Sequence, residues 1–457
     1  MMSLGGVLHR LFLSIVAIPF ILLLYVVVLH LLPDEALSPG AAAWLQLERV
    51  AVPKEQNSHY LILGMEAPAG VDSREYGEAR VERIVTVERE RPRREDENQD
   101  HYLPDGYAQE VQIERATLNN LCNPVEEYCI ERYRSGADAL FAQGDNALLL
   151  ARYRVLRGLA HYQTIEPVGL YTPFPRLALL TDAQRLQHVA IVKRFLEGER
   201  AAALEELAND LRFSRMLMAE ADTLLMRMIS IRMVANVWHI YSQLLEVPDA
   251  GDVLAAIEAI PSLSDAERDF ELVLAGEFRF DAQATESLET QLLEIEGGPV
   301  KKLFLSLIPV RKNRMLNRLY LYLNDLASHD ALSPSQIAAR NSEGADRRFL
   351  ESGVWDYLVD PVTSIVMLFT VPNYSPYLLR HRALDGLLRV LKLKAAIRAM
   401  NVPAAGLDAF IIASPFASAY PDEVAPIRWD AGANALSYTA VGEGSSRYLS
   451  RVYFHLN

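Results

Sequence analysis

Apolar residues are concentrated near the N-terminus, where Leu11 to Leu32 reads LFLSIVAIPFILLLYVVVLHLL without a formally charged side chain. As an α-helix this stretch would be about 33 Å long, enough for a hydrocarbon core of about 30 Å. A cleaved signal peptide is the alternative, since small residues follow in PGAAAW at 39–44. The apolar core of a signal peptide, however, is usually only about 7–15 residues long. Residues 11–32 are therefore predicted to be an uncleaved transmembrane signal-anchor helix.

The charges on either side of this stretch predict its orientation. His9 and Arg10 precede it, whereas Asp34 and Glu35 follow it. Because basic flanks stay in the cytoplasm, residues 1–10 are predicted to be a cytoplasmic tail, and the chain after Leu32 is predicted to lie outside the cytoplasm. Prolines and polar residues interrupt the other long uncharged stretch, 361–379, so a single span is expected.

Residues 33–116 show no sustained periodicity and are predicted to be a linker and juxtamembrane region. Tyr60 to Leu63 are apolar and bounded by turn residues, which fits either a short buried strand or one buried helical turn. At 88–97, ERERPRREDE mixes charges of both signs, a composition typical of a solvated loop.

A helical domain is predicted from 117 to 400, because apolar residues recur there at steps of three and four. Ser135 and Thr181 are candidate starts of two of its helices, and Gly198 is a stop signal. Ser264 has the spacing of a capping box with Glu267. Further helices are predicted at 311–327 and 378–400.

The longest periodic stretch, from Arg200 to Glu246, predicts one continuous helix that is apolar nearly all round and lies at the centre of a bundle. Its methionines are interpreted as core residues, with a pliable client-binding face as the alternative. Arg215 and Asp222 lie seven residues apart on one helical face, too far for most direct contacts. Each is therefore expected to pair with another helix.

The C-terminal segment, 401–457, has a different pattern. APIRWD, ALSYTAV and RYLSRVYFHL are short, β-prone and separated by the turn-forming AGAN and GEGSS. They predict a small antiparallel β cap of three strands. The fold class is therefore mainly α: one N-terminal transmembrane helix, a helical domain and this cap.

Cys122 and Cys129 are the two cysteines of the chain. Outside the cytoplasm, cysteines so close together are expected to form a disulfide, with a free or redox-active pair as the alternative. A continuous helix would separate their Cα atoms by about 10.5 Å, more than the roughly 7 Å a disulfide allows. The segment must therefore bend, and Asn123-Pro124 is the expected place. Pro124 could then start the helix that follows.

Composition excludes several classes of function. The net charge of −14 disfavours a nucleic-acid partner, which needs a concentrated excess of cations. The sequence lacks histidine pairs at helical spacing, a phosphate-binding glycine loop and a serine nucleophile motif, so neither a metal site nor a cofactor is predicted. The richest acid–base cluster, at 99–107, is interpreted as a polar turn. Catalytic residues stay unknown.

Cations gather in two places in this otherwise acidic chain. The first group surrounds LFLSLIPV at 303–310, and the second follows the uncharged 361–379. Apolar segments beside cations suit contact with anionic lipid or an acidic partner. The favoured interpretation, however, is that the apolar segments are core and that the cations solvate its edge or pair with surplus acids. The candidate contact residues are Lys301, Lys302, Arg311, Lys312, Arg314, Arg318, Arg380, Arg382, Arg389 and Lys392.

The anchor, YLILGMEAPAG, LCNPVEEYC and the ending IRWD…ALSYTAVGEG together resemble uncharacterised membrane-anchored periplasmic proteins of proteobacteria. This resemblance implies the inner membrane of a Gram-negative cell, with the body in the periplasm, and implies no activity. The leading hypothesis is a non-enzymatic docking or scaffold protein that contacts an envelope protein partner or the membrane surface. An envelope-acting hydrolase with a site built from dispersed residues, or an anchored chaperone, is the alternative.

Overall fold

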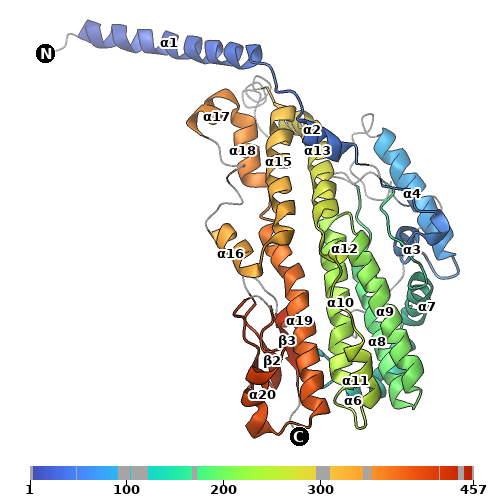
Figure 1. Ribbon diagram of the computed structural model, residues 1–457. Helices are drawn as coiled ribbons and strands as arrows, with labels where there is room; N and C mark the ends of the chain where they lie inside the picture. The colour runs from blue at the N-terminus through green and yellow to red at the C-terminus, as the bar shows by residue number, and fades with distance from the viewer. Residues whose placement is uncertain are drawn as a thin grey trace. The chain divides into compact units, whose positions relative to one another are not determined.

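The computed structural model describes residues 4–47, 49–90, 103, 122–166, 172–294, 309–342, 348, 353–420, 423–440 and 447–454. Along these residues the chain is mainly helical, with one small antiparallel sheet near the C-terminus, as predicted (Figure 1). It forms two compact units, each assembled from separate segments. Unit 1 comprises Met1–Leu47, Phe278–Leu326 and Gly344–Asn373, and unit 2 comprises Glu48–Glu277, Ala327–Glu343 and Tyr374–Asn457.

Among its described residues, unit 1 contains three long helices and several short ones. Its elements are α1 (Leu4–Leu31), α2 (Pro39–Leu45), most of α13 (Glu271–Glu294), most of α15 (Lys312–Ala327), α17 (Val354–Val359) and α18 (Pro361–Thr370). Aromatic rings join three of these helices: Trp44 makes edge-on contacts with Phe278 at 5.9 Å and with Tyr320 at 5.2 Å between ring centroids. Such aromatic pairs stabilise the packing beyond the contribution of the apolar area that they bury.

Unit 2 holds the larger core. Its elements in chain order are α3 (Ser58–Gly64), α4 (Ser73–Glu90), α6 (Ile130–Phe141), α7 (Asn146–Leu156), α8 (Leu177–Leu196), α9 (Arg200–Glu220), α10 (Leu224–Leu244), α11 (Gly251–Glu258), α12 (Asp265–Arg268), α16 (Pro334–Ser342), α19 (Ser375–Ala399), α20 (Leu407–Ala413), β1 (Arg428–Asp430), β2 (Ala435–Ser437), α21 (Arg447–Ser450) and β3 (Arg451–Tyr453).

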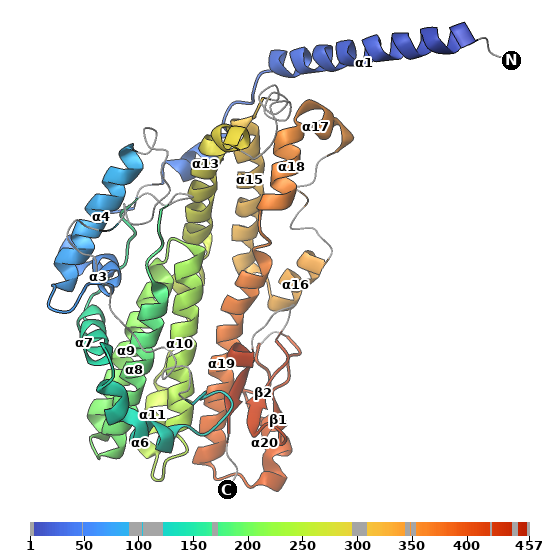
Figure 2. The same ribbon diagram turned by 180° about the vertical axis from the view of Figure 1, so that it is seen from behind.

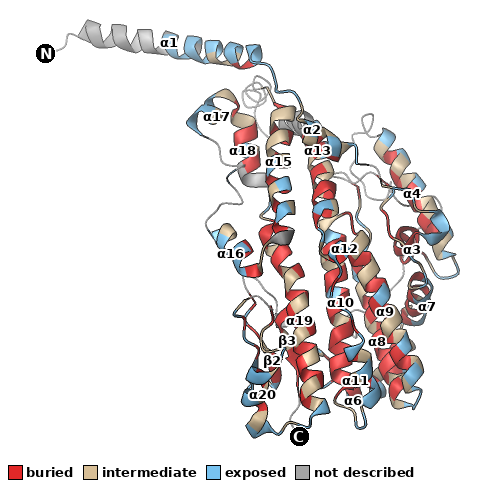
Figure 3. Cartoon of the chain, viewed as in Figure 1, coloured by how far each residue is buried: buried red, intermediate tan, exposed pale blue. Residues whose placement is uncertain are grey.

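Helix α10 lies at the centre of unit 2, where it packs against α8, α9 and α19 (Figures 1 and 3). Trp238 is fully buried, and Met226 and Met233 of the same helix are buried as well. The all-round apolar pattern therefore predicted the central helix correctly, and these methionines are core residues. Since each methionine side chain is flexible, it fills irregular gaps between the helices.

The predicted continuous helix from Arg200 to Glu246 is wrong in one respect: the chain breaks it at residues 221–223. Thr223 leaves helical geometry and its side chain accepts a hydrogen bond from the N–H of Met226, so it caps α10. The carboxylate of Asp222 binds partners on other segments. The side chains of Asp222 and Thr223 thus stabilise the break and the start of α10 that follows it.

Two predicted helix starts are also wrong. Ser135 lies inside α6 and Thr181 inside α8. Their hydroxyls donate to backbone oxygens three residues earlier, to Arg132 O at 3.4 Å and to Ala178 O at 2.9 Å. These residues therefore bond back into the helix instead of capping it. The predicted stop at Gly198 is confirmed by its φ of 99°, which suits glycine.

The capping box of Ser264 and Glu267 is confirmed, but the helix it opens, α12, ends at Arg268. The buried side chain of Arg227 explains this interruption. Its guanidinium donates to the backbone oxygens of Glu267 and Asp269. In a longer helix these oxygens would accept hydrogen bonds from backbone N–H groups further along the chain. Because they accept from the Arg227 side chain, the helix ends.

Cys122 and Cys129 form the predicted disulfide, with their Cα atoms 5.4 Å apart. The chain bends at 124–127, as predicted. The helix that follows, α6, starts only at Ile130, later than a start at Pro124 would give. A closed bridge is incompatible with helix between the two cysteines, so helical geometry begins after the second one.

The C-terminal sheet has the order β1-β2-β3 with both pairs antiparallel, which confirms the predicted cap. It lies against α19, as the reverse view shows (Figure 2). Leu436 and Val452, which pair across two strands, are fully buried. The sheet therefore covers apolar side chains of the helical core.

The segment from Tyr60 to Leu63 forms part of helix α3. Of the two alternatives for this segment, a short buried strand and a buried helical turn, the helical turn is therefore correct.

Of the helices in the described ranges, none combines the length and apolarity that a membrane crossing requires. The predicted span at 11–32 consequently stays a prediction, although residues 4–31 are helical.

Candidate functional site

The predicted basic contact residues have different environments in the structure. Lys301 and Lys302 lie outside the described residues. Arg311 is buried and donates to the backbone oxygen of Leu29 at 3.2 Å. Arg314 pairs with acids of unit 1, including Glu35 and Asp356. Lys312 approaches the backbone oxygen of Glu286 at 3.5 Å, and Arg318 is partly buried on the same helix.

The second basic group, on α19 of unit 2, also has contacts within the chain. Arg389 donates to the backbone oxygens of Ser418 and Pro415, and Lys392 donates to that of Ile260. The guanidinium of Arg380 lies over the ring of Tyr377. Arg382 is partly buried. The two groups thus belong to different units, and lipid contact by these cations stays a prediction.

An apolar surface of unit 1 was missed by the sequence analysis. In α17, Val354 and Trp355 are each 78% exposed and Leu358 is 47% exposed. The acid of the same helix, Asp356, pairs with Arg314, and Asp360, which directly follows the helix, is buried. A helix on the surface of a soluble protein normally shows the opposite arrangement, with polar side chains outward and apolar side chains inward.

Helix α1 presents a second apolar surface in unit 1. Its exposed large side chains include Phe20, Leu23 and Val27. The hydroxyl of Tyr25 donates to the backbone oxygen of Leu358 at 2.8 Å, which joins α1 to α17. We call the exposed apolar side chains of α1 and α17 the apolar surface of unit 1. Soluble proteins rarely expose large apolar patches unless these contact another molecule or a membrane.

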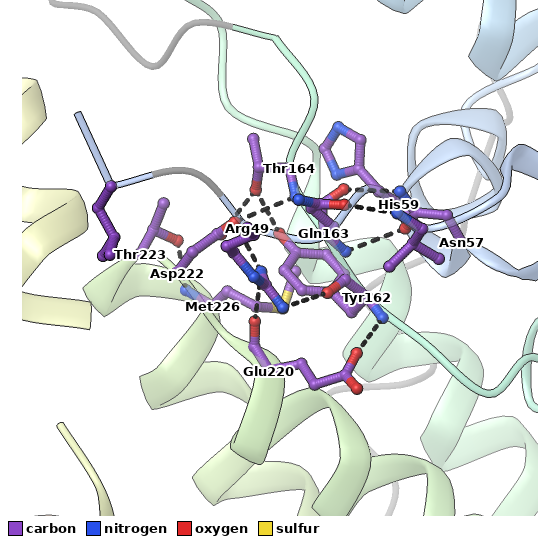
Figure 4. Close-up of polar contacts among 12 residues, drawn as sticks. Arg49, Asn57, His59, Tyr162, Gln163, Thr164, Glu220, Asp222, Thr223 and Met226 are labelled. Atoms are coloured by element: carbon purple, nitrogen blue, oxygen red, sulfur yellow. Dashed lines mark hydrogen bonds and ion pairs between the residues drawn. The ribbon is translucent and has the colours of Figure 1, made fainter. Parts of the chain in front are cut away.

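Unit 2 contains a buried polar cluster where residues 49–59 meet residues 161–166 and the break between α9 and α10 (Figure 4). Backbone bonds join the first two segments: Ser58 N–H donates to His161 O at 2.8 Å, and His161 N–H donates to Gln56 O at 3.3 Å. The side chain of Asn57 adds two more bonds with the backbone of Gln163. Residues far apart in sequence are thereby fixed side by side.

Asp222 is the anchor of this cluster. Its carboxylate accepts the hydroxyl of Thr164 at 2.7 Å and a guanidinium N–H of Arg49 at 3.2 Å. Arg49 also donates to the backbone oxygens of Glu220 and Tyr162. The predicted pairing of Arg215 with another helix is confirmed, because it pairs with Glu267 of α12. For Asp222 the prediction of a helical partner is wrong, since Arg49 and Thr164 lie outside helices.

His59 and Glu166 form a buried ion pair next to Asp222, with 2.6 Å between Nε2 and Oε2. Burial opposes charge on both groups, but their mutual attraction and hydrogen bond outweigh it. The pKa of His59 is consequently raised and the pKa of Glu166 lowered from their usual values. The other ring nitrogen, Nδ1 of His59, is buried without a hydrogen-bond partner among the described residues.

A small cavity of about 20 Å³ adjoins this cluster. Its lining includes His59, Tyr162, Thr164 and Glu166 together with apolar residues such as Met226. The volume is enough for about one water molecule. In chemical terms, the cluster offers an imidazole oriented by a carboxylate and neighbouring hydroxyls, without room for a larger ligand.

The sequence analysis missed His59, Glu166 and Arg49, because residues more than a hundred positions apart meet only in the folded chain. No described group of histidine, cysteine and acidic side chains has the arrangement of a metal site. The cluster predicted at 99–107 lies outside the described residues. Comparison of the chain with protein-family profiles, curated proteins and solved structures gives no significant match.

Proposed function

We propose that the protein is an envelope protein anchored in the inner membrane by residues 11–32, which docks on the membrane surface and holds unit 2 outside the cytoplasm. One observation carries the proposal: unit 1 exposes apolar side chains on α1 and α17, while Asp356 of α17 pairs with Arg314. Apolar side chains that face outward next to an uncharged 22-residue stretch suit a bilayer as their surroundings.

Helix α17 is the docking element in this proposal. Tryptophan is enriched where hydrocarbon meets the headgroups, and Trp355 is 78% exposed on a helix bonded to α1. With α1 in the bilayer, α17 would rest in the interface and bury Val354, Trp355 and Leu358 in lipid. The charge flanks of α1 support a cytoplasmic N-terminus and an external unit 2.

Two measurements test this proposal. Alkaline phosphatase fused to the C-terminus is expected to be active, and deletion of 11–32 is expected to release the protein from membranes. In proteoliposomes containing brominated lipid, Trp355 fluorescence should be quenched. The quenched fraction is expected to fall in Trp355→Phe and to persist in Trp429→Phe, whose altered residue belongs to β1 of unit 2. Equal quenching in all three proteins would refute lipid contact by α17.

A hydrolase is the second candidate, and the His59–Glu166 pair favours it. Paired with Glu166, the imidazolium of His59 next to a cavity of about one water's volume has the parts of a general acid and its positioning group. Turnover of a panel of ester and phosphoester substrates, lost in His59→Gln and retained in His161→Gln, would support it. Absence of turnover by the unaltered protein across the panel would count against it.

A further inference from the structure

A groove of about 440 Å³ in unit 2 is separate from the acid–base cluster. One side is formed by the end of α7 and the residues after it, and the other by the middle of α9. Both helices pack against α8. The residues that line it are Arg154, Arg157, Gly158, Leu159, Ala160, Asn209, Arg212, Phe213 and Met216. Three of them are arginines and none is acidic.

These arginines differ from most of their neighbours, because none has a carboxylate within ion-pairing distance among the described residues. Arg154 donates to the side-chain oxygen of Gln187, Arg157 to the backbone oxygen of Glu206, and Arg212 to the side chain of Asn209. Elsewhere in unit 2 guanidinium groups reach acids: Arg194 pairs with Glu206, Arg200 with Asp252, Arg215 with Glu267, Arg268 with Asp385 and Arg398 with Glu246.

Three cations along one concave surface repel each other unless an anion lies between them. The chain carries a surplus of acids, with a net charge of −14, yet none of the described acids neutralises this groove. In addition, the Nε of Arg157 is buried and lacks a hydrogen-bond partner among the described residues. Such a donor is costly to leave unsatisfied.

The floor and rim of the groove add an apolar component. Phe213 is almost fully buried, and Leu159 and Met216 are partly buried. Arg154 and Arg212 are exposed, so a ligand can reach the groove from solvent. The volume lies within the range of sites for small molecules, which combine apolar walls with a few charged groups that fix orientation.

From this arrangement we infer that the groove binds a small phosphate monoester that carries a compact apolar group. The planar guanidinium fork matches phosphate oxygens, and a doubly charged group with three terminal oxygens can accept from several arginines at once. The apolar group would lie against Leu159 and Met216. This inference does not depend on membrane anchoring, since all lining residues belong to unit 2.

Calorimetric titration of the full-length protein in a non-ionic detergent tests the groove, with phenyl phosphate as the probe. We expect binding that weakens as sodium chloride is added, and weaker binding of inorganic phosphate, which lacks the apolar group. Phenol, which lacks the charge, is expected not to bind. Equal binding of phenol and phenyl phosphate would overturn the assignment.

Variants locate the binding. Arg212→Gln removes an exposed guanidinium and is expected to weaken phenyl phosphate binding at least about tenfold, as the loss of a charged hydrogen bond implies. Met216→Glu brings a carboxylate to the groove and should weaken binding further. Arg134→Gln is the matched control, because Arg134 is an exposed arginine on α6 that pairs with Glu131. It is expected to bind like the unaltered protein.

Circular dichroism of each variant verifies that it is folded. Equal affinities of Arg212→Gln and the unaltered protein would overturn the inference. Flotation with phosphatidylcholine vesicles containing phosphatidic acid separates a soluble ligand from a lipid headgroup. Arg212-dependent vesicle binding without binding of phenyl phosphate would overturn the assignment of a small soluble ligand.

Discussion

The side-chain oxygen of Gln243, in α10, accepts a hydrogen bond of 2.9 Å from the backbone N–H of Cys129, 114 residues away in sequence. The amide nitrogen of Gln243 donates to the backbone oxygens of Pro124 and Glu127 at 2.8 and 2.9 Å. One buried glutamine thus satisfies three backbone groups of the turn that the disulfide closes. The disulfide turn is thereby attached to the central helix of unit 2.

Gln243→Leu should destabilise unit 2, because it leaves these backbone groups without their partner in the interior. We expect the free energy of unfolding to fall by about 3 kcal/mol, in line with the cost of buried unsatisfied polar groups. Denaturant titration followed by circular dichroism measures it. Gln283→Leu, at an exposed glutamine of α13, should change it little. Similar losses in both variants would show that the turn contacts contribute nothing specific.

Removal of the disulfide should have a smaller effect. Closing a loop of this length is worth about 2.5 kcal/mol in the chain-entropy model, so Cys122→Ala/Cys129→Ala is expected to lower the thermal midpoint while the protein stays folded. Reducing agent should lower the midpoint of the unaltered protein and not that of the double variant. Mass spectrometry of unreduced peptides should show the two cysteines linked. Free thiols in protein isolated from membranes would contradict the predicted oxidising location.

The His59–Glu166 pair predicts a pH dependence. The raised pKa of His59 means that its contribution to stability is complete below the unfolded pKa of about 6.5 and is lost as the pH rises through the folded value. The lowered pKa of Glu166 keeps its contribution in place above about pH 4.3 and removes it at lower pH. The stability difference between the unaltered protein and His59→Gln should therefore shrink as the pH rises from the unfolded pKa of about 6.5 through the raised folded pKa of His59.

His239 provides a control of opposite sign. Its burial lowers its pKa to about 4, so the folded chain gives up this proton more readily than the unfolded chain. Stability linked to His239 should therefore grow as the pH rises from the folded pKa of about 4 to the unfolded pKa of about 6.5, and should change little above it. Thermal midpoints of His59→Gln below and above its unfolded pKa, and of His239→Gln between about pH 4 and about pH 6.5, measure both effects. A change of the same sign in both variants would contradict the assignment.

A close approach between α3 and α4 makes Gly77 irreplaceable. A Cβ atom at Gly77 would lie 1.8 Å from the backbone oxygen of Tyr60, whereas one at Gly136 would meet nothing within 4 Å. Gly77→Ala must therefore push the two helices apart, and we expect a loss of about 3 kcal/mol in the free energy of unfolding.

Gly136→Ala is the matched control, since Gly136 lies inside α6. Alanine favours helix over glycine by about 1 kcal/mol, so this variant should unfold at a slightly higher temperature than the unaltered protein. If Gly77→Ala were as stable as Gly136→Ala, the helices would not approach each other as closely as the structure shows.

Local patterns determined much of this fold from sequence alone. The nearly all-round apolar pattern of residues 200–246 predicted a central helix, although as one helix where the chain forms α9 and α10. The alternation of β-prone segments with turns after residue 425 predicted the three-stranded sheet. The spacing of Cys122 and Cys129 required a bend. Each of these inferences depends on neighbours within a few residues, where periodicity and stereochemistry suffice.

Tertiary structure decided the breaks and the sites. The helix interruption at Asp222 depends on Arg49 and Thr164, and the early end of α12 depends on Arg227. The meeting of His59 with Glu166, and the groove that Arg157 shares with Arg212, likewise join distant segments. A sequence pattern records which residues can form a helix, but the partner that satisfies a buried polar group is chosen only when the chain packs.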